Sequence, residues 1–338
     1  MVQKRNIDAV INSLHNYTLI DVRTPLEFSK GHIPGAYNIP LLTNEDRVLV
    51  GTSYKQQGRQ AAIKLGFELV GSKWKHFIEQ AEALQEGKPF LVHCWRGGMR
   101  SGSMAWAFDL YGLHVETLIG GYKAYRNALP SSFEKTYNLR ILSGKTGSGK
   151  TRILHALKQR GEQVLDLEDL AQHQGSSFGS MGKLIQPSQE QFENDLHREL
   201  VQMDAEKPIW VESESILIGL RTIPKSFFQQ MEHAKSIDLV IPREKRLDYL
   251  TADYGVLDKE FLKFAVLAIS KRLGPEQTKE ALLAIRENRM RDFVDWVLAY
   301  YDKLYQKSVE KREPTKVIQM PFEEIKVNEI AETISTLK

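Results

Sequence analysis

Residues 144–151 read GKTGSGKT and match the pattern G-x-x-x-x-G-K-[ST] in full. This pattern forms a loop between a buried strand and a helix, and the backbone N–H groups of the loop converge on phosphate oxygens. The apolar run LRILSG contains its first residue, and a helical pattern, RILHALKQRG, follows it. The sequence therefore predicts an α/β domain with a phosphate-binding loop. Its residues are Gly144, Lys145, Thr146, Gly147, Ser148, Gly149, Lys150 and Thr151.

Short apolar runs alternate with helical patterns on both sides of this loop. Before the loop, strands are expected at residues 18–23, 36–41, 89–94 and 114–121, and helices at residues 58–70, 72–85 and 101–113. From the loop onward, strands are expected at residues 139–144, 163–168, 207–214 and 236–242, helices at 149–161 and about 243–311, and a last strand and helix after residue 315. Such alternation is typical of α/β folds built on parallel sheets with helices on both faces.

A polar stretch, LPSSFEKTYN at residues 129–138, separates the two series and is expected to be irregular. We therefore expect a first domain at residues 1–130, a linker at 131–138 and a second domain at 139–338. The helical region of the second domain is expected at about residues 243–312. A length of 338 residues suits two domains of ~100–200 residues each.

Composition narrows the class of protein. No apolar stretch approaches the roughly 18–20 residues that cross a bilayer, and the beginning MVQKRNIDAV lacks the apolar core of a secretory signal. The single cysteine cannot form an internal disulfide, so the cytoplasm is the expected compartment. The net charge of +3 permits a polyanionic partner but does not by itself argue for nucleic acid.

The only cysteine, Cys94, ends the apolar run PFLVHC and opens the loop CWRGGMRS. In open α/β sheets, ligands bind at the carboxyl ends of strands, and the first turn of the following helix offers free N–H groups. Gly97 and Gly98 let the backbone curl, while Arg96 and Arg100 add positive charge. Such surroundings lower the pKa of a thiol and favour the nucleophilic thiolate. We predict a cradle for a tetrahedral anion above a reactive Cys94; the alternative is a small buried core residue. The anion-binding residues would be Trp95, Arg96, Gly97, Gly98, Met99, Arg100 and Ser101.

The phosphate loop needs charged partners. Lys150 would carry charge to the terminal phosphoryl group, and Thr151 would hold Mg²⁺ if a metal complex binds. A carboxylate is expected at the end of a later strand, where PIWVESES offers Glu212 and Glu214 and VLDLED offers Asp166. The ES ending is unusual for an ATPase, so diphosphate binding is better supported than nucleotide hydrolysis. Either glutamate could instead be a solvated strand-end charge.

Two families share the features of the cysteine loop. DVRTPLEFSKGHIPGAYNIP at residues 21–40 resembles the N-terminal signature of rhodanese domains, and IGGYKAYRNALP at residues 119–130 resembles the segment that closes that domain. The spacing His93-Cys94-x5-Arg100-Ser101 resembles cysteine-dependent phosphatases. Rhodanese loops commonly have one residue fewer between cysteine and arginine, so this loop should admit a phosphate-sized oxyanion. Conventional tyrosine phosphatases also supply an Asp general acid from another loop, and no motif for one is apparent.

A rhodanese-type cysteine followed by a phosphate loop resembles the bacterial tRNA 2-selenouridine synthases. The stretches CWRGGMRSGSMAW, LEDLAQHQGSSFG and WVESESILIG resemble elements of that family, and the likeness runs from about Asp21 to Arg312. It implies a transferase that replaces the sulfur of wobble 2-thiouridine in a tRNA anticodon with selenium from selenophosphate. It also implies an S-geranylated intermediate made from geranyl diphosphate. No tightly bound cofactor is expected, and Mg²⁺ is permitted.

The resemblance also implies roles for residues. Cys94 would be the cysteine required for selenation, its loop would hold selenophosphate, and the phosphate loop would hold the diphosphate of the prenyl donor. A geranyl chain needs an apolar slot, which SSFGSMG and ILIGL could line unless they belong to the core. The candidate residues of this second-domain site are Glu212, Glu214, Ser177 and Phe178.

The second domain would also bind the anticodon stem-loop. Single-stranded RNA is bound by aromatic and arginine stacking, with basic side chains on phosphates. The segment RENRMR places arginines three and five residues apart on an expected helix. The alternative is a solvated face with salt bridges, and the nearby aromatic residues are expected to be mostly core. The candidate tRNA contacts are Arg272, Arg286, Arg289 and Arg291.

Two other functions fit parts of this pattern. One is a cysteine phosphatase or a rhodanese-type sulfurtransferase fused to a nucleotide-binding module. The other is a catalytically inactive rhodanese-type binding module joined to a GTPase-like switch, which the intact Cys94 disfavours. Copurified tRNA would support the transferase, and release of phosphate from an aryl phosphate would support the phosphatase.

Overall fold

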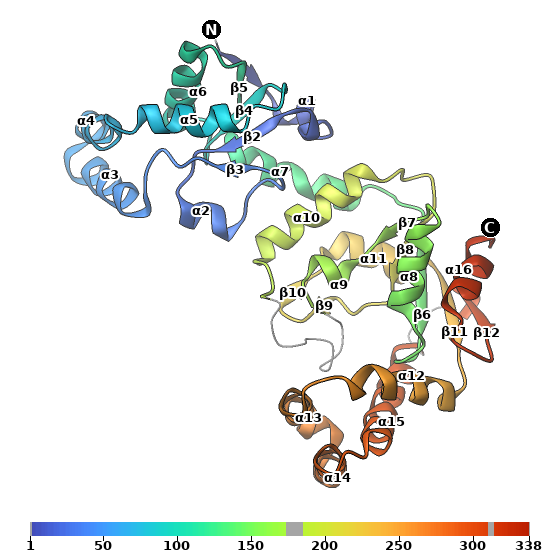
Figure 1. Ribbon diagram of the computed structural model, residues 1–338. Helices are drawn as coiled ribbons and strands as arrows, with labels where there is room; N and C mark the ends of the chain where they lie inside the picture. Colours follow the sequence, from blue (N-terminus) through green and yellow to red (C-terminus); the bar gives the residue numbers. More distant parts are fainter. Residues whose placement is uncertain (1, 174–184, 310–313, 338) are drawn as a thin grey trace. The chain divides into compact units, whose positions relative to one another are not determined.

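The computed structural model describes residues 2–173, 185–309 and 314–337, which form two compact units (Figure 1). The first unit comprises Met1–Phe133 and Glu190–Val201. The second comprises Glu134–Gln189 and Gln202–Lys338. Each unit contains its own five-stranded sheet, and all strand pairs in both sheets are parallel. The expected α/β architecture is confirmed.

The sheet of the first unit has the strand order β1-β5-β4-β2-β3. Its central strands are buried along their whole length, as expected for parallel strands covered by helices on both faces. The strands are β1 (Gln3–Arg5), β2 (Thr18–Asp21), β3 (Tyr37–Asn38), β4 (Phe90–His93) and β5 (Val115–Leu118). The helices are α1 (Ile7–Val10), η1 (Leu14–Asn16), α2 (Pro25–Lys30), α3 (Asn44–Gln57), α4 (Arg59–Val70), α5 (Trp74–Ala83), α6 (Met99–Tyr111), α7 (Gly121–Glu134) and α10 (Gln189–Gln202).

Helix α7 extends further than the sequence suggested. We expected irregular backbone from residue 129, but the helix continues to Glu134. Leu129 and Phe133 are buried on one face of it, and their packing outweighs the poor helix propensity of Pro130 between them. Only the four residues after Glu134 separate the helix from the next strand.

Helix α10 is the part of the chain that the domain pattern does not reveal. It follows the phosphate-loop segment in sequence, yet residues 190–201 pack within the first unit. The amide of Asn194, which is fully buried, donates to the carbonyl of His32 and to the hydroxyl of Tyr122, each at 2.8 Å. Arg126 in turn donates to Asn194 Oδ1 at 2.7 Å. The cysteine-loop unit is therefore completed by a distant segment of the chain.

The sheet of the second unit has the strand order β12-β11-β6-β8-β7. Strand β6, which leads into the phosphate loop, lies at its centre, and a short antiparallel pair, β9 and β10, lies outside it. The strands are β6 (Leu139–Gly144), β7 (Gln163–Leu165), β8 (Ile209–Glu212), β9 (Leu217–Ile218), β10 (Arg221–Thr222), β11 (Lys235–Val240) and β12 (Val317–Pro321). The helices are α8 (Lys150–Gln159), α9 (Leu167–Leu170), α11 (Lys225–His233), α12 (Arg243–Gly255), α13 (Lys259–Leu273), α14 (Pro275–Arg286), α15 (Met290–Val309), η2 (Pro314–Lys316) and α16 (Val327–Ser335).

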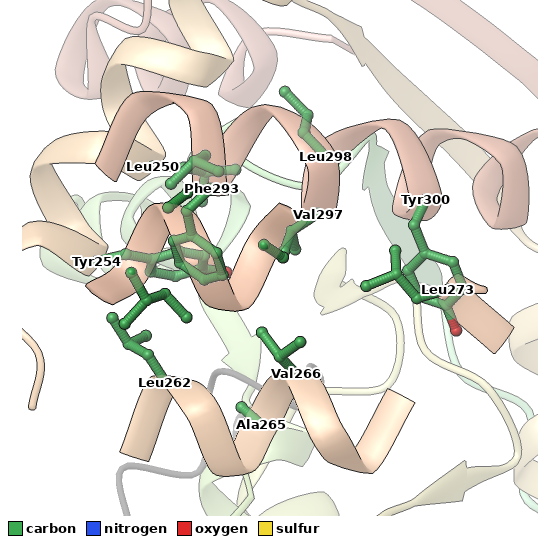
Figure 2. Packing of buried hydrophobic residues seen from close by; sticks show 14 of the residues in the cluster. Leu250, Tyr254, Leu262, Ala265, Val266, Leu273, Phe293, Val297, Leu298 and Tyr300 are labelled. Carbon is green, nitrogen blue, oxygen red and sulfur yellow. The ribbon is translucent and has the colours of Figure 1, made fainter. Parts of the chain in front are cut away.

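The expected helical region is confirmed as helices α12 to α15, which share an apolar core (Figure 2). Phe293 and Val297 of α15 face Leu262 and Val266 of α13 across it. Tyr300 is buried in the same core, so this part of the aromatic stripe is structural, as expected. Across the described ranges, no helix has the length and apolar character needed to span a bilayer.

Candidate functional site

Cys94 lies between β4 and α6, at the carboxyl end of the strand. Its side chain is buried, but its sulfur has polar contacts: the Gly98 N–H donates to Sγ at 3.3 Å, and the Ser101 hydroxyl lies 3.3 Å from it. Burial favours the neutral thiol, but hydrogen bonds from Ser101 and Gly98 and the charge of Arg100 outweigh it. They hold the pKa of Cys94 below its ordinary value. Cys94 thus belongs to a buried apolar cluster and also has polar contacts that favour the thiolate.

The backbone turns that support this loop require glycine. Gly97 has φ +64°, and a Cβ there would lie 2.4 Å from the carbonyl oxygen of Leu118. Gly121 has φ +58°, and its Cβ would lie 2.2 Å from the carbonyl oxygen of Cys94. The N–H of Tyr122 donates to that same carbonyl at 2.9 Å. The two glycines let the segment after β5 pack directly against the cysteine loop, which fixes the loop's shape.

Of the two arginines of the cysteine loop, Arg100 is fixed by an ion pair with a residue outside the loop. Arg100 pairs with Glu27 of α2, with 2.7 Å between Nη1 and Oε2, and this pairing keeps the pKa of Glu27 low despite burial. Thr24 and Glu27 form a reciprocal cap at the start of α2, so the carboxylate is itself fixed. Arg96, Trp95 and Met99 are exposed. The cysteine loop therefore has one anchored cation and one solvent-facing cation.

Beneath the cysteine loop lies a buried polar network that motif reading only partly identified. Asp21 and Arg23 form an ion pair at 2.7 Å with both side chains almost fully buried, and Arg23 lies 3.8 Å above the ring centroid of Tyr122. Burial and the charge of Arg23 lower the pKa of His93 although nearby Asp21 opposes them, so the imidazole is neutral. The rhodanese-like signature includes Asp21 and Arg23, and the segment that resembles the end of a rhodanese domain includes Tyr122, but neither predicts that these three side chains meet.

Removing the Ser101 hydroxyl tests the thiolate directly. A hydrogen bond to a charged group is worth about 1.5–3 kcal/mol, so Ser101→Ala should lower the rate of alkylation of Cys94 by iodoacetamide at neutral pH roughly tenfold. The pKa is depressed in the folded protein, so losing this contact must raise it and move the pH–rate profile to higher pH. Because Cys94 is the only cysteine, the loss of free thiol reports on it alone.

A profile that Ser101→Ala does not move would show that Ser101 does not stabilise the thiolate. Ser103→Ala, two residues further along α6, provides a matched serine control. Circular dichroism would check that all three proteins are equally folded.

The phosphate loop has the expected strand, loop and helix. Lys150 Nζ donates to the carbonyl of Gly144 at 3.0 Å, and it lies 3.5 Å from the carboxylate of Glu212. The hydroxyl of Thr151 donates to Glu212 Oε2 at 3.0 Å. Ser148 Oγ is fully buried and has no partner among the described residues. The loop thus contains a cation and a buried hydroxyl without a partner among the described residues.

Three carboxylates gather beside this loop. Glu168, Glu212 and Glu214 each place an oxygen within 4.8 Å of the other two. Burial and the neighbouring carboxylates raise the pKa of Glu168 to about 9 and that of Glu214 to about 8. Glu214 is half-buried and lies against the other two carboxylates of this cluster. Sequence reasoning did not single out Glu168, although it begins the stretch EDLAQHQ. Asp166 instead accepts from the Asp169 N–H and caps α9.

Residues of the helical region contact the phosphate loop directly. Arg246 of α12 is buried; it donates to the carbonyl of Thr146 at 3.1 Å and pairs with both oxygens of Asp302 of α15 at 2.8 Å. Gly147 has φ +80°, and a Cβ there would lie 2.7 Å from the side chain of Leu250. The helices therefore pack tightly against the loop.

The remaining candidates fall into two groups. Ser177 and Phe178 lie outside the described residues. Arg272, Arg286, Arg289 and Arg291 are all exposed, the first near the end of α13 and the others around the α14–α15 turn. Three of them pair with carboxylates: Arg286 and Arg289 with Glu287, and Arg291 with Glu244 at 2.7 Å. The salt-bridged surface that was weighed as an alternative is therefore present.

The fold and the two loops define a class of protein: a rhodanese-like domain with a cysteine loop, joined to a phosphate-loop domain with a helical region. A model of rhodanese-like domains matches residues 6–128, and a model described as the tRNA 2-selenouridine synthase AAA domain matches residues 137–333. The chain belongs to the tRNA 2-selenouridine synthase family. The resemblance on which the sequence interpretation rested is confirmed.

Curated relatives agree with this assignment over most of their length. The tRNA 2-selenouridine synthase of Nitrosomonas europaea is 36% identical and covers 87% of this chain, which covers 89% of that protein. Those of Shewanella frigidimarina and Shewanella denitrificans are 37% and 38% identical. They cover 90% and 85% of this chain, which covers 92% and 87% of them.

Proposed function

We propose that this chain is a tRNA-modifying transferase that converts wobble 2-thiouridine to 2-selenouridine in two steps. The first is S-geranylation by geranyl diphosphate, and the second is exchange of the geranylated sulfur for selenium from selenophosphate. The observation that carries the proposal is that one chain of this family contains two different loops, each between a buried strand and the start of a helix. One contains an activated thiol, and the other a lysine and carboxylates. The absence of any disulfide partner for Cys94 supports a cytoplasmic location.

The geranylation step would use the phosphate loop. The sulfur of 2-thiouridine attacks C1 of the geranyl group, the C1–O bond breaks, and diphosphate leaves with the electron pair. Lys150 and the converging N–H groups would stabilise the charge that develops on the leaving oxygen. The carboxylates and the Thr151 hydroxyl are hard oxygen ligands of the kind that Mg²⁺ prefers, so Thr151 and Glu212 would hold such an ion. When bound, it would add charge neutralisation of the diphosphate.

The selenation step would use the cysteine loop. We propose that the Cys94 thiolate attacks phosphorus of selenophosphate, so that an S–P bond forms, the P–Se bond breaks and selenide leaves. Selenide then attacks C2 of the nucleobase and displaces geranylthiolate, while water releases phosphate from Cys94. The five residues between Cys94 and Arg100 and the Ser101 contact to Sγ support this path.

An acid-quenched reaction should yield a peptide with phosphorylated Cys94; a peptide that stays unmodified at every time point would contradict it.

The anticodon stem-loop would bind the helical region, with Arg272, Arg286, Arg289 and Arg291 on RNA phosphates. Arg289 and Arg291 would exchange their carboxylate partners for phosphate oxygens. Exposed ion pairs of this kind contribute only about 0–1 kcal/mol each, so breaking them would cost little free energy.

The decisive experiment omits one co-substrate at a time. Purified protein is incubated with a 2-thiouridine tRNA, geranyl diphosphate and selenophosphate, and the digested nucleosides are measured by mass spectrometry. We expect 2-selenouridine with both co-substrates and S-geranyl-2-thiouridine without selenophosphate. Formation of 2-selenouridine at the same rate without geranyl diphosphate would exclude the two-step route. Hydrolysis of an aryl phosphate without any tRNA product would favour the phosphatase instead.

A further inference from the structure

The first unit contains an apolar pocket that the proposed chemistry has not yet used. Its volume is about 240 Å³, just below the ~300–1,000 Å³ typical of ligand pockets. Helices α3 to α6 form its walls, with Tyr54, Gly66 and Phe67 among the lining residues. Tyr54 and Phe67 are both more than half exposed, so the pocket has an apolar rim open to solvent. A concave and mostly apolar surface is the usual form of a site for an apolar ligand.

The pocket is adjacent to the cysteine loop. Met99, Arg100 and Ser103 line it, and they belong to the first turns of α6, which begins at that loop. Gly98, the residue before α6, donates its N–H to Cys94 Sγ. Cys94 is also part of the buried cluster that contains Leu41 and Leu42, two further residues of the pocket wall. The first turn of α6 therefore lies between Cys94 and the apolar pocket.

We infer that this pocket holds the geranyl chain of S-geranyl-2-thiouridine while selenium displaces the geranylthiolate. The inference rests on the proposed function, in which the geranyl chain is the one large apolar group that must approach the cysteine loop. During the step, the C2–Se bond forms and the C2–S bond breaks. Geranylthiolate leaves with the electron pair of that bond and takes a proton from water, so no oxidant or reductant is needed. Holding the chain in the pocket orients C2 toward the selenium and keeps the departing group out of water.

Gly66 offers a way to fill the pocket without disturbing the fold. A Cβ at this position would meet nothing within 4 Å, and the residue lies within helix α4, where a glycine weakens the helix. Gly66→Leu therefore adds a side chain to open space. Glu68→Leu is the matched control, because it adds the same side chain to the same helix at an exposed position outside the pocket.

The experiment supplies the intermediate directly. An anticodon stem-loop RNA with S-geranyl-2-thiouridine, and a second RNA with the five-carbon S-dimethylallyl group, are each incubated with selenophosphate and the full-length protein. We expect Gly66→Leu to raise KM for the geranylated RNA at least about tenfold and to change the dimethylallyl reaction less than about twofold. Glu68→Leu should match the unsubstituted protein with both RNAs.

The outcomes separate this inference from the proposed function. If the unsubstituted protein does not selenate the geranylated RNA, the proposed function fails. If it does, and Gly66→Leu is equally active, the pocket does not hold the chain. An equal loss with both RNAs would indicate a structural defect or another occupant, such as a protein or membrane surface, and would also overturn the inference. Should Gly66→Leu fold poorly, Tyr54→Ala removes an exposed rim residue instead and should raise KM for the geranylated RNA alone.

Discussion

Replacing Cys94 with serine should abolish selenium incorporation while leaving geranylation measurable. The contacts from Gly98 and Ser101 stabilise a thiolate, and a serine hydroxyl in the same place stays neutral at physiological pH. Loss of a catalytic nucleophile lowers the rate of its step by on the order of 10⁴–10⁶-fold. The phosphate loop lies in the other unit and shares no residue with the cysteine loop. Nucleoside mass spectrometry should therefore find S-geranyl-2-thiouridine but no 2-selenouridine.

Folding must be excluded as the cause of such a loss. Serine is nearly the same size as cysteine, so the buried position should tolerate it, and circular dichroism and the midpoint of urea unfolding would check this. Gly102→Ala serves as a control for a small change at the start of α6, since a Cβ there would meet nothing within 4 Å and the residue does not line the pocket. Parallel loss of both reactions in a folded Cys94→Ser protein would show that the two steps share one nucleophile, contrary to the division of labour proposed.

The sequence predicted the parts of the structure that depend on local rules. The phosphate loop at Gly144–Thr151 follows from a glycine-rich pattern that few backbones satisfy, and the cysteine loop follows from a cysteine placed between a buried strand and a helix start. Both loops occur where expected, and the helical region after β11 is confirmed. In these segments, apolar periodicity and turn residues agree with the final fold.

Other features depend on contacts between residues far apart in sequence. Helix α10 joins the first unit because Asn194 satisfies buried partners on His32 and Tyr122, and no local pattern encodes that pairing. The end of α7 was misjudged because buried Leu129 and Phe133 outweigh a proline and two serines. Tertiary packing overrides local propensity in both cases.

In the candidate site too, some residues could be predicted from the local sequence, whereas others are brought in only by long-range contacts. Glu212 was expected at the end of a strand, and the structure brings it to Lys150 and Thr151. Glu168 lies in a different element, and only the fold places its carboxylate beside those of Glu212 and Glu214. The apolar pocket is built from residues of the four helices α3 to α6 together with Leu41 and Leu42, which lie in separate parts of the sequence. A pocket of that kind cannot be found by reading one helix at a time.

The carboxylate cluster makes the charge of Lys150 more important than in an isolated phosphate loop. Lys150 opposes the upward shift in the pKa of both Glu168 and Glu214, and it lies 3.5 Å from Glu212. A diphosphate in this loop would lie near the Glu212 carboxylate, so a cation would have to offset the repulsion between the two anions. In the proposed reaction, the lysine would therefore affect the binding of the diphosphate as well as its departure.

Replacing Lys150 with alanine should accordingly block geranylation and spare selenation of an RNA that is already geranylated. Removing one donor that stabilises developing charge lowers a rate by roughly 10²–10³-fold, and the loss of the cation beside Glu212 should weaken diphosphate binding further. The measurement is the rate of S-geranyl-2-thiouridine formation from geranyl diphosphate, beside the rate of selenation of the pre-geranylated stem-loop RNA. Only the first should fall.

The control is Lys158→Ala, an exposed lysine on the same helix α8 that removes the same charge away from the loop. It should leave both rates within about twofold of the unsubstituted protein, since salt largely screens the charge of a solvent-exposed side chain outside the loop. Full geranyl transfer by a folded Lys150→Ala protein would remove the phosphate loop from the prenylation step. Loss of both reactions would mean that selenation also depends on this loop. Because the geranylated RNA bypasses the first step, a defect in one loop cannot be mistaken for a defect in the other.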